Sequence, residues 1–499
     1  MEENGKRIEE TGSQRGVSLS RRIVKAMGVF GGVQVLTMLF SLIRIKLLAI
    51  FVGPAGVGLL GILNSTLDMT YSATSLSLRN SSVRDIAAEG DERHRRSIIA
   101  VLRRWSLLVG ALGLLVVLVA SPLFSLSAFK STAYTWAFLA VAVVMMFNAL
   151  ADGEKAVLQG TCQLRYLASS QVWGAALGLA ACIPLFYFLK DDGIVPAVIA
   201  CSALAALAMW CYGRKAVPYS LRADVPWRDT WRVGRGFVKL GFFMMLSTFM
   251  GFLANYLFVM WLTHSGGVNT VGLYQAGYTI VDKYAGLIFT AMAVEYYPRL
   301  ACVVADKLKA AEYVSRQIGV TMVVMLPVVV IMMLLASPIV AILYSEKFMA
   351  AVPLVVVALS GSLFRVVSWS MAYYILARGS GKLYFVTETL SAIATLVVNI
   401  AGYHYGGLAG LGYAYVGGQI AYVIITFVCC RFYYHLWLSG KVWLFTAVAL
   451  AASGAVMWAV TAGAWWLAIA VAVIASAASA VTLWKMIKGQ PRTDYNSQN

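Results

Sequence analysis

The sequence repeats itself after about 215 residues, and the repeated segments are long apolar stretches of the kind that cross a membrane. Five short matches occur in the same order at nearly constant spacing, which argues against chance. Many transporters are built by internal duplication of a helical membrane unit, with the substrate path between the two copies. The matched pairs are Val57-Gly58-Leu59 with Val271-Gly272-Leu273, Asp68 with Asp282, Arg84 with Arg299, Ala120-Ser121-Pro122 with Ala336-Ser337-Pro338, and Gly193-Ile194 with Gly407-Leu408.

The composition places the chain among proteins that cross the bilayer many times. Of its 499 residues 60% are hydrophobic and 12% are charged, and the mean hydropathy is +0.77. A spanning helix needs about 20 mostly apolar residues. We therefore predict an all-α fold with fourteen transmembrane helices: two six-helix repeats, or lobes, around a central cavity, and a C-terminal helix pair. The predicted spans are 24–51, 57–79, 98–126, 132–151, 166–189, 194–213, 237–263, 271–298, 317–344, 351–377, 383–404, 408–432, 441–462 and 464–486.

The formal charge of +18 is concentrated in two connections on one side of the predicted bundle. The positive-inside rule explains this excess, so the basic surface is expected to face anionic lipid, and nucleic acid is not an expected partner. We expect a multi-pass membrane protein with both termini in the cytoplasm. The two basic clusters are Arg84, Arg93, Arg95, Arg96, Arg103 and Arg104, and Arg214, Lys215, Arg222, Arg228, Arg232, Arg235 and Lys239.

This topology divides the chain into six parts. The connection between the lobes carries Trp227 and Trp231 among charges. It fits either an amphipathic helix on the inner leaflet or a plain linker with membrane-anchoring tryptophans. The cysteines and histidines show no metal-ligand spacing, so neither a metal nor a cofactor is expected. The predicted parts are a cytoplasmic tail 1–22, an N-lobe 23–213, a cytoplasmic linker 214–236, a C-lobe 237–433, a helix pair 434–487 and a cytoplasmic tail 488–499.

Polar side chains occur at helical spacing inside several predicted spans. Asp68 and Asp282 both fall near the middle of the bilayer, where a charge costs about 2.5–3.5 kcal/mol and needs a partner, a cavity or a function. Buried ion pairs that fix helix packing would explain single charges, whereas regular stripes favour a water-filled vestibule between the lobes. The predicted stripes are Gln34, Thr37, Ser41 and Arg44; Asn64, Asp68, Ser72, Ser75 and Arg79; Gln275, Thr279, Asp282 and Thr290; and Glu388, Ser391, Thr395 and Asn399.

The residue types in these spans suggest an anionic substrate and a cation, H⁺ or Na⁺, as the driving species. Guanidinium groups match phosphate oxygens in a bidentate geometry, carboxylates take up cations, and aromatic rings stack on sugars. Asp282 and Lys283 are not predicted to pair, because sequence neighbours do not share a helix face. The candidates for binding pyrophosphate or sugar are Arg44, Asn64, Arg79, Gln275, Lys283, Arg365, Trp369 and Tyr373, and those for ion coupling are Asp68, Asp282 and Glu388.

Four segments carry a resemblance to a known family. They are K-L-L-A-I-F-V-G-P-A-G-V-G-L from Lys46 to Leu59, V-G-L-Y-Q-A from Val271 to Ala276, E-Y-Y-P-R-L from Glu295 to Leu300, and Y-S-E-K-F from Tyr344 to Phe348. The chain resembles the multidrug/oligosaccharidyl-lipid/polysaccharide (MOP) superfamily over residues 24–433. Within it the chain is most similar to the polysaccharide translocases called Wzx, in particular those for enterobacterial common antigen.

This resemblance implies a flippase of the bacterial inner membrane whose two lobes close alternately on the two membrane faces. The implied partners are an oligosaccharide on undecaprenyl pyrophosphate, membrane lipid and the polymerase and chain-length machinery of polysaccharide synthesis. The implied cargo is a repeat unit of O-antigen, common antigen or capsule. The last two helices depart from twelve-helix members of the group, and related fourteen-helix flippases use such a pair as a groove for the lipid tail. The resemblance gives no role to Lys283.

Two other classes stay open from the sequence. A cation-coupled multidrug exporter of the same superfamily would favour acidic residues in the first helix, where this chain has Arg44 and Lys46. A membrane-embedded polysaccharide polymerase or ligase would need a large periplasmic loop with catalytic groups, and the predicted loops on that side are short. A transporter rather than an enzyme is therefore expected, with no catalytic residues.

Overall fold

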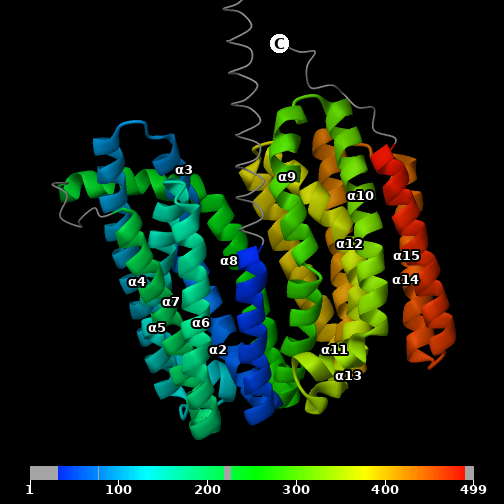
Figure 1. The fold of residues 1–499 in the computed structure, drawn as a ribbon, viewed down its shortest axis with the longest axis horizontal. Coiled ribbons are helices and arrows are strands. Elements are labelled where there is room, and N and C mark those ends of the chain that lie inside the picture. The colour runs from blue at the N-terminus through cyan, green and yellow to red at the C-terminus, as the bar shows by residue number, and fades with distance from the viewer. Residues whose placement is uncertain (1–31, 77, 218–225, 489–499) are drawn as a thin grey trace, which may run out of the picture. The chain divides into compact units, whose positions relative to one another are not determined.

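The computed structural model describes residues 32–76, 78–217 and 226–488, and every regular element in these ranges is a helix (Figure 1). The predicted tail 1–22, nearly all of the tail 488–499 and the middle of the linker lie outside the described residues. The elements are an unlabelled first helix (Gly32–Phe51), α2 (Pro54–Thr74), α3 (Leu78–Ala88), α4 (Glu92–Phe129), α5 (Thr135–Gly160), α6 (Leu164–Leu189), η1 (Lys190–Gly193), α7 (Ile194–Ala216), α8 (Trp227–Thr279), η2 (Ile280–Tyr284), α9 (Leu287–Val303), α10 (Lys307–Leu334), α11 (Ala336–Leu343), η3 (Glu346–Ala351), α12 (Val352–Ala377), α13 (Gly381–Tyr434), α14 (Gly440–Thr461) and α15 (Trp465–Lys488).

Ten segments of the described chain are long and apolar enough to cross a membrane. Three of them have 46 to 54 residues, which at about 1.5 Å per residue is at least about twice the hydrocarbon thickness of ~30 Å. Each is interrupted, by η1, by Gly267 or by Gly407, so each is able to cross twice. An all-helical, multi-pass membrane protein is thus confirmed, while the count of fourteen spans stays a prediction. The three long segments are Leu164–Ala216, Met245–Thr290 and Gly381–Tyr434.

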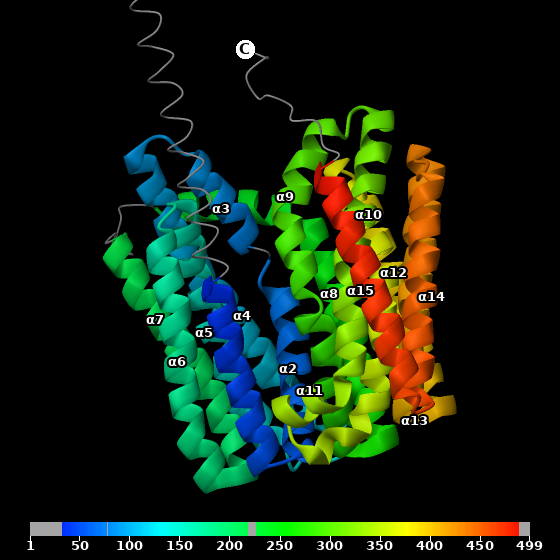
Figure 2. The same cartoon turned by 45° about the vertical axis from the view of Figure 1, so that its right-hand side comes forward.

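The chain forms two compact units. Unit 1 comprises Met1–Phe51, Thr70–Leu126 and Lys130–Phe242, and unit 2 comprises Val52–Met69, Ser127–Phe129 and Phe243–Asn499. In unit 1, α5 packs against α3, α6 and α7, and α6 packs along α7. In unit 2, α12 contacts α10 and α13, and α14 and α15 lie side by side against α10 (Figure 2). Each unit therefore has its own helical core.

The repeat seen in the sequence has a counterpart inside unit 2. Gly53 and Gly267, at equivalent repeat positions, both adopt a positive φ, of 90° and 79°, a conformation that favours glycine. A few residues later the repeated Gly58 and Gly272 meet. A Cβ atom on Gly58 would lie 2.1 Å from the Val268 carbonyl oxygen, and one on Gly272 would lie 1.9 Å from the Pro54 carbonyl oxygen. The start of α2 and the end of α8 therefore cross through the two copies of one motif.

Two predicted spans are broken where uninterrupted helices were expected. The span 57–79 was wrong in its last five residues, because α2 ends at Thr74 and Leu76 has a φ of 50°, so Ser75 and Arg79 do not continue the face of Asp68. The span 271–298 was also wrong as one regular helix, because the π-helical turn η2 interrupts it. A π-turn adds a residue to the helical repeat and shifts the faces on either side of it. The stripe predicted from Gln275 to Thr290 is therefore interrupted at η2.

Two other boundaries also differ from the prediction. The span predicted at 317–344 is divided, since α10 ends at Leu334 and α11 starts at the repeated Ala336. The span predicted to end at Ala151 continues as α5 to Gly160. This extension holds because Glu154 has a partner in α4: Arg103 Nε and Nη2 lie 2.6 Å and 2.8 Å from its two carboxylate oxygens. Both side chains are only 5–6% exposed, so this ion pair fixes the packing of α4 on α5.

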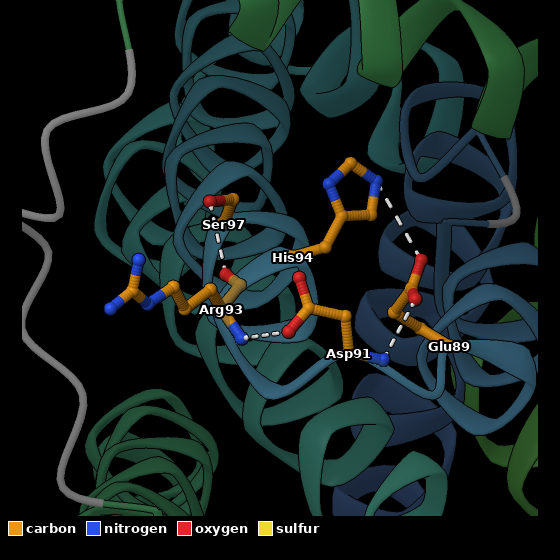
Figure 3. Close-up of polar contacts among 5 residues, drawn as sticks. All are labelled: Glu89, Asp91, Arg93, His94 and Ser97. Atoms are coloured by element: carbon orange, nitrogen blue, oxygen red, sulfur yellow. Dashed lines mark hydrogen bonds and ion pairs between the residues drawn. The ribbon is translucent and has the colours of Figure 1, made fainter.

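The start of α4 lies in the connection that was predicted to carry the first basic cluster (Figure 3). Asp91 caps the helix by accepting a hydrogen bond from the Arg93 backbone N–H at 3.1 Å, and Ser97 Oγ donates to the Arg93 carbonyl oxygen at 3.3 Å. Glu89 accepts from the Asp91 N–H at 3.0 Å and lies 3.7 Å from His94 Nε2. Acidic groups at the N-terminus of a helix interact favourably with the helix dipole. They help α4 to begin at Glu92, before the apolar stretch predicted from residue 98.

The first turns of α8 belong to unit 1 and run across the ends of its long helices (Figure 1). Trp105 Nε1 of α4 donates to the Thr230 carbonyl oxygen at 2.9 Å, and the Trp105 and Trp231 rings meet edge to face at 5.2 Å. The Arg104 guanidinium lies 5.3 Å from the Trp227 ring centroid. Trp227 and Trp231 remain about 60% exposed. The C-terminal end of the predicted linker is helical from Trp227 onward, whereas its position on the inner leaflet stays a prediction.

Candidate functional site

The described residues contain a cavity in each unit. The N-cavity, about 310 Å³, lies in unit 1 between the first helix, α5, α6 and α7. The C-cavity, about 260 Å³, lies in unit 2 between α8, η2, α12 and α13. The predicted cation Arg44 lines the first, and the predicted Asp282, Arg365 and Glu388 line the second. Charged residues that the sequence placed in spans thus form two separate groups.

In the C-cavity, two predicted site residues are bonded to each other. Arg365 Nη1 lies 2.5 Å from Asp282 Oδ1, and both side chains are close to 30% exposed. Asp282 is carried by the π-turn η2 and Arg365 by the middle of α12. The guanidinium also lies 5.2 Å from the centroid of the Phe289 ring, a favourable cation–π distance. Arg365 was predicted to bind substrate and Asp282 to couple an ion, and the structure joins them as one ion pair.

The α13 side of the C-cavity carries the third predicted charge. Glu388 accepts a short hydrogen bond from the Tyr422 hydroxyl, and Ser391, Thr395 and Asn399 line the same cavity. This is the face that helical spacing predicted. Gln419 also lines the cavity, and its buried Oε1 has no hydrogen-bond partner. The C-cavity therefore joins carboxylates to neutral oxygen donors, a set of groups suited to a small cation.

The two aromatic candidates lie outside the residues that line the C-cavity. Trp369 packs 5.4 Å from the ring of Tyr296, and Tyr373 packs 5.7 Å from the ring of Tyr297. Tyr296 is itself buried and donates to the Ser370 carbonyl oxygen at 2.9 Å. Trp369 and Tyr373 thus belong to an aromatic cluster between α9 and α12 in this structure, and their predicted stacking on sugar stays untested.

In the N-cavity, the positive charges form no ion pair among the described residues. Arg44 projects from the first helix together with Thr37 and Ser41, as its predicted stripe requires, and its Nε is buried without a hydrogen-bond partner. Lys155 of α5 forms no ion pair among the described residues. The cavity's carboxylate, Asp152, instead accepts a hydrogen bond of 2.7 Å from the Tyr71 hydroxyl. This arrangement provides positive charge to an incoming anion.

The other predicted site residues line neither cavity. Asn64 and Asp68 are exposed on α2, Lys283 is exposed in η2, and Gln275 is half-buried against Gly61. Arg79 lies in α3, where its Nε is 3.4 Å from Gln159 Oε1 of α5. The helical stripe on α2 is therefore present from Asn64 to Ser72 and is not continued by Arg79.

Sequence reasoning missed Tyr71, Asp152, Lys155 and Tyr422. The polar run Asp152-Gly153-Glu154-Lys155 was treated as the end of a span, although Asp152, Lys155 and Gln159 have the i, i+3, i+7 spacing of one helix face. That spacing was the signal that could have found the N-cavity. No cluster of three or more His, Cys, Asp or Glu that could hold a metal occurs among the described residues.

A family model described as "Polysaccharide biosynthesis protein" matches residues 47–353. No individually curated protein sequence matches the chain. Among solved structures, the fold is similar to lipid II flippase MurJ in an inward closed conformation, with 11% identity, 92% of this chain and 99% of that chain covered, and a TM-score of 0.69.

Two further structures share the fold. One is an inward-facing multidrug resistance MATE family transporter of the MOP superfamily, with 16% sequence identity and a TM-score of 0.67. The match covers 80% of this chain and 94% of the transporter's chain. A MOP superfamily transporter from Pyrococcus furiosus, described by a reverse polarity of its binding pocket, has 16% identity, coverages of 86% and 95%, and a TM-score of 0.55. The neighbours are transporters, in agreement with the expectation of a transporter rather than an enzyme.

Proposed function

Because the chain belongs to the polysaccharide biosynthesis protein family, we propose that it is a flippase for a lipid-linked oligosaccharide. The cargo is an oligosaccharide on undecaprenyl pyrophosphate, and the movement is from the cytoplasmic to the periplasmic leaflet of a bacterial inner membrane. Both termini lie in the cytoplasm in this proposal. Sugars and pyrophosphate cannot cross hydrocarbon unaided, whereas the prenyl tail can remain in the lipid beside the protein.

The buried Nε of Arg44, which has no hydrogen-bond partner, is the observation that carries the proposal. A buried guanidinium nitrogen without an acceptor is costly, so a state in which an anion fills the N-cavity is favoured. A guanidinium matches the geometry of phosphate oxygens and is permanently charged. A lipid-linked oligosaccharide brings an anion of this kind to the protein, together with sugars for the polar groups of the cavity.

The C-cavity supports an ion-coupled mechanism. Glu388, Ser391, Thr395 and Asn399 offer oxygen atoms to H⁺ or Na⁺, and Arg365 holds Asp282 nearby. We propose that cation binding at Glu388 changes the balance of charges around this pair and thereby favours one conformation over the other. The proposal requires that the cation bind the two conformations with different affinity, since otherwise it shifts nothing.

The second candidate is a cation-coupled multidrug exporter of the same superfamily. It is favoured by the acidic and tyrosine-rich lining of the C-cavity, which includes Tyr274, Tyr278 and Tyr415 and suits an organic cation. The lack of a second carboxylate beside Asp152 in the lining of the N-cavity speaks against it. Sugar identity within the first proposal, with common antigen as the most similar group, is a matter for a panel of lipid-linked oligosaccharides.

The test is transport in proteoliposomes, read by an added glycosidase that cleaves only outward-facing oligosaccharide. We expect protein-dependent exposure that falls in Arg44→Ala and remains in Arg299→Gln, a change at an exposed residue paired with Glu295. The reconstituted protein is assayed with and without H⁺ and Na⁺ gradients. Efflux of organic cations without any exposure of oligosaccharide would contradict the flippase proposal and favour the exporter.

A further inference from the structure

Two cysteines face each other across the helical hairpin of α6 and α7 in unit 1. The Sγ atoms of Cys182 and Cys201 are 3.2 Å apart, and both residues are free thiols. Each lies about two helical turns from η1, the turn that joins the helices, so the pair lies at one level of the hairpin. The sulfur atoms of a disulfide are about 2 Å apart, so a small movement of the two side chains is enough to join them.

Small residues hold the two helices close together at this level. A Cβ atom on Gly174 would lie 3.1 Å from the Ala205 Cα atom. A Cβ atom on Gly178 would lie 3.3 Å from Cys201 Sγ, and the Cys201 thiol donates to the Gly178 carbonyl oxygen at 3.6 Å. Gly174, Gly178 and Cys182 recur at i, i+4 spacing and so share one face of α6. The backbones of α6 and α7 therefore bring the two thiols within reach of each other.

The two thiols differ in what can reach them. Cys182 is fully buried, whereas Cys201 is half-buried and lines the N-cavity. Arg44 and Lys155 line the same cavity, and positive surroundings of this kind are typical of reactive cysteines, because the nucleophile is the thiolate. A reagent that enters the N-cavity therefore meets Cys201 first and reaches Cys182 only through it.

We propose that Cys182 and Cys201 are a site of thiol–disulfide exchange, at which a low-molecular-weight disulfide oxidises the pair and joins α6 to α7. The thiolate of Cys201 attacks one sulfur atom of the reagent, forms a mixed disulfide and releases the other half of the reagent as a thiolate. The thiolate of Cys182 then attacks the Cys201 sulfur atom and releases the second half. Each released thiolate takes up the proton that one cysteine has lost. One reagent disulfide is thus reduced to two thiols, and one protein disulfide is formed.

The bond makes the N-cavity sensitive to the redox state of its surroundings. It removes the Cys201 thiol from the cavity lining and fixes α6, which carries Cys182, to α7. The bond also closes a loop around η1 and restricts the unfolded chain, so the oxidised protein should melt at a higher temperature than the reduced one. This inference is independent of the proposed function, because it concerns neither the cargo nor the driving ion.

The test is treatment of the full chain in nanodiscs with hydroxyethyl disulfide, a small neutral reagent, followed by alkylation of the remaining thiols and peptide mapping by mass spectrometry. In the wild type we expect Cys182 and Cys201 to be linked to each other. In Cys182→Ala we expect Cys201 to keep the hydroxyethyl group as a stable mixed disulfide. In Cys201→Ala we expect Cys182 to remain a free thiol, because it is buried. Cys302→Ser, a change at an exposed cysteine of α9, is the matched control and keeps the linkage.

The wild type alone already decides the main point, so the test does not depend on the folding of a variant. A mixed disulfide that persists on Cys201 in the wild type, or a linkage that forms only after unfolding in guanidinium chloride, would overturn the proposal. Modification of Cys182 in Cys201→Ala with an unchanged elution profile would do the same. The oxidised wild type is expected to melt several degrees higher than the reduced protein, and dithiothreitol should reverse the shift. A lower melting temperature after oxidation would show that the bond distorts the hairpin and would contradict the inferred fit.

Discussion

The two cavities differ in how their charges are balanced. In the C-cavity Arg365 is bonded to Asp282 and Glu388 is bonded to Tyr422, so each charge has a partner within the protein. In the N-cavity Arg44 has a buried nitrogen without a partner, and Lys155 forms no ion pair among the described residues. A charge that is already paired can fix or switch a conformation, whereas a charge without a protein partner is available to a ligand. In the function that we propose, unit 1 therefore binds the anion and unit 2 couples the cation.

The largest effect is expected for the buried ion pair of Arg103 and Glu154 in unit 1, which lines neither cavity. Replacing Arg103 by Ala leaves Glu154 buried without a partner, and such a change costs about 3–5 kcal/mol of stability. We expect a large drop in the apparent melting temperature of the purified protein. The double variant Arg103→Met with Glu154→Leu should recover most of the loss, because it removes both charges. A full loss in the double variant would contradict a purely structural role.

The unpaired cation of the N-cavity should matter for transport and little for stability. We expect Arg44→Ala to reduce oligosaccharide exposure by about a hundredfold, which corresponds to about 2.7 kcal/mol, with a nearly unchanged melting temperature. Arg44→Lys keeps the charge without the bidentate geometry and should lose about tenfold. Initial rates in proteoliposomes measure both. A large fall in stability together with transport would show that Arg44 has a partner within the fold.

The paired charges of the C-cavity should behave as a unit. Asp282→Asn and Arg365→Gln are each expected to reduce transport about tenfold, and the double variant should lose no more than either single one. Because both side chains are close to 30% exposed, each single change should alter stability by only about 1 kcal/mol. A double-mutant cycle on transport rates and melting temperatures checks this. Additive losses would mean that the two residues act independently.

The smallest effect is expected at Glu388, and only in the response to a gradient. Glu388→Gln keeps the hydrogen-bonding capacity towards Tyr422 and removes the negative charge. We expect its transport without a gradient to match that of the wild type, while the several-fold stimulation by an H⁺ or Na⁺ gradient is lost. Val397→Thr, at an exposed position of α13 outside the lining of the C-cavity, is the control that keeps the charge. Stimulation that persists in Glu388→Gln would assign coupling to another group.

Sequence reasoning predicted much of the fold, because the repeat is visible as short matched motifs. It identified the repeated motif whose two copies, at Gly58 and Gly272, are in contact in the structure. It also identified the polar face of α13 around Glu388. It failed where regular periodicity fails: the break after Thr74 ends one stripe, and the π-turn η2 changes the register of another. An assumed constant of 3.6 residues per turn cannot anticipate either.

Of the charged residues in the N-cavity, sequence reasoning predicted Arg44 and missed Asp152 and Lys155. Arg44 lies in an apolar span, where its charge stands out, whereas Asp152 and Lys155 lie in a polar run that looks like a loop. Only the fold shows that this run stays helical, because the partner of Glu154 comes from a position 51 residues earlier in the chain. Likewise, no local pattern links Asp282 to Arg365, which are 83 residues apart.

The most direct test of the division of work is equilibrium binding of pyrophosphate to Arg44→Ala and Arg365→Ala, measured side by side in nanodiscs. Both variants remove one arginine from the lining of a cavity, so they are matched in chemistry. The account predicts that pyrophosphate binding is lost in Arg44→Ala and retained in Arg365→Ala. Retention in Arg44→Ala with loss in Arg365→Ala would contradict it and place the anion in the C-cavity.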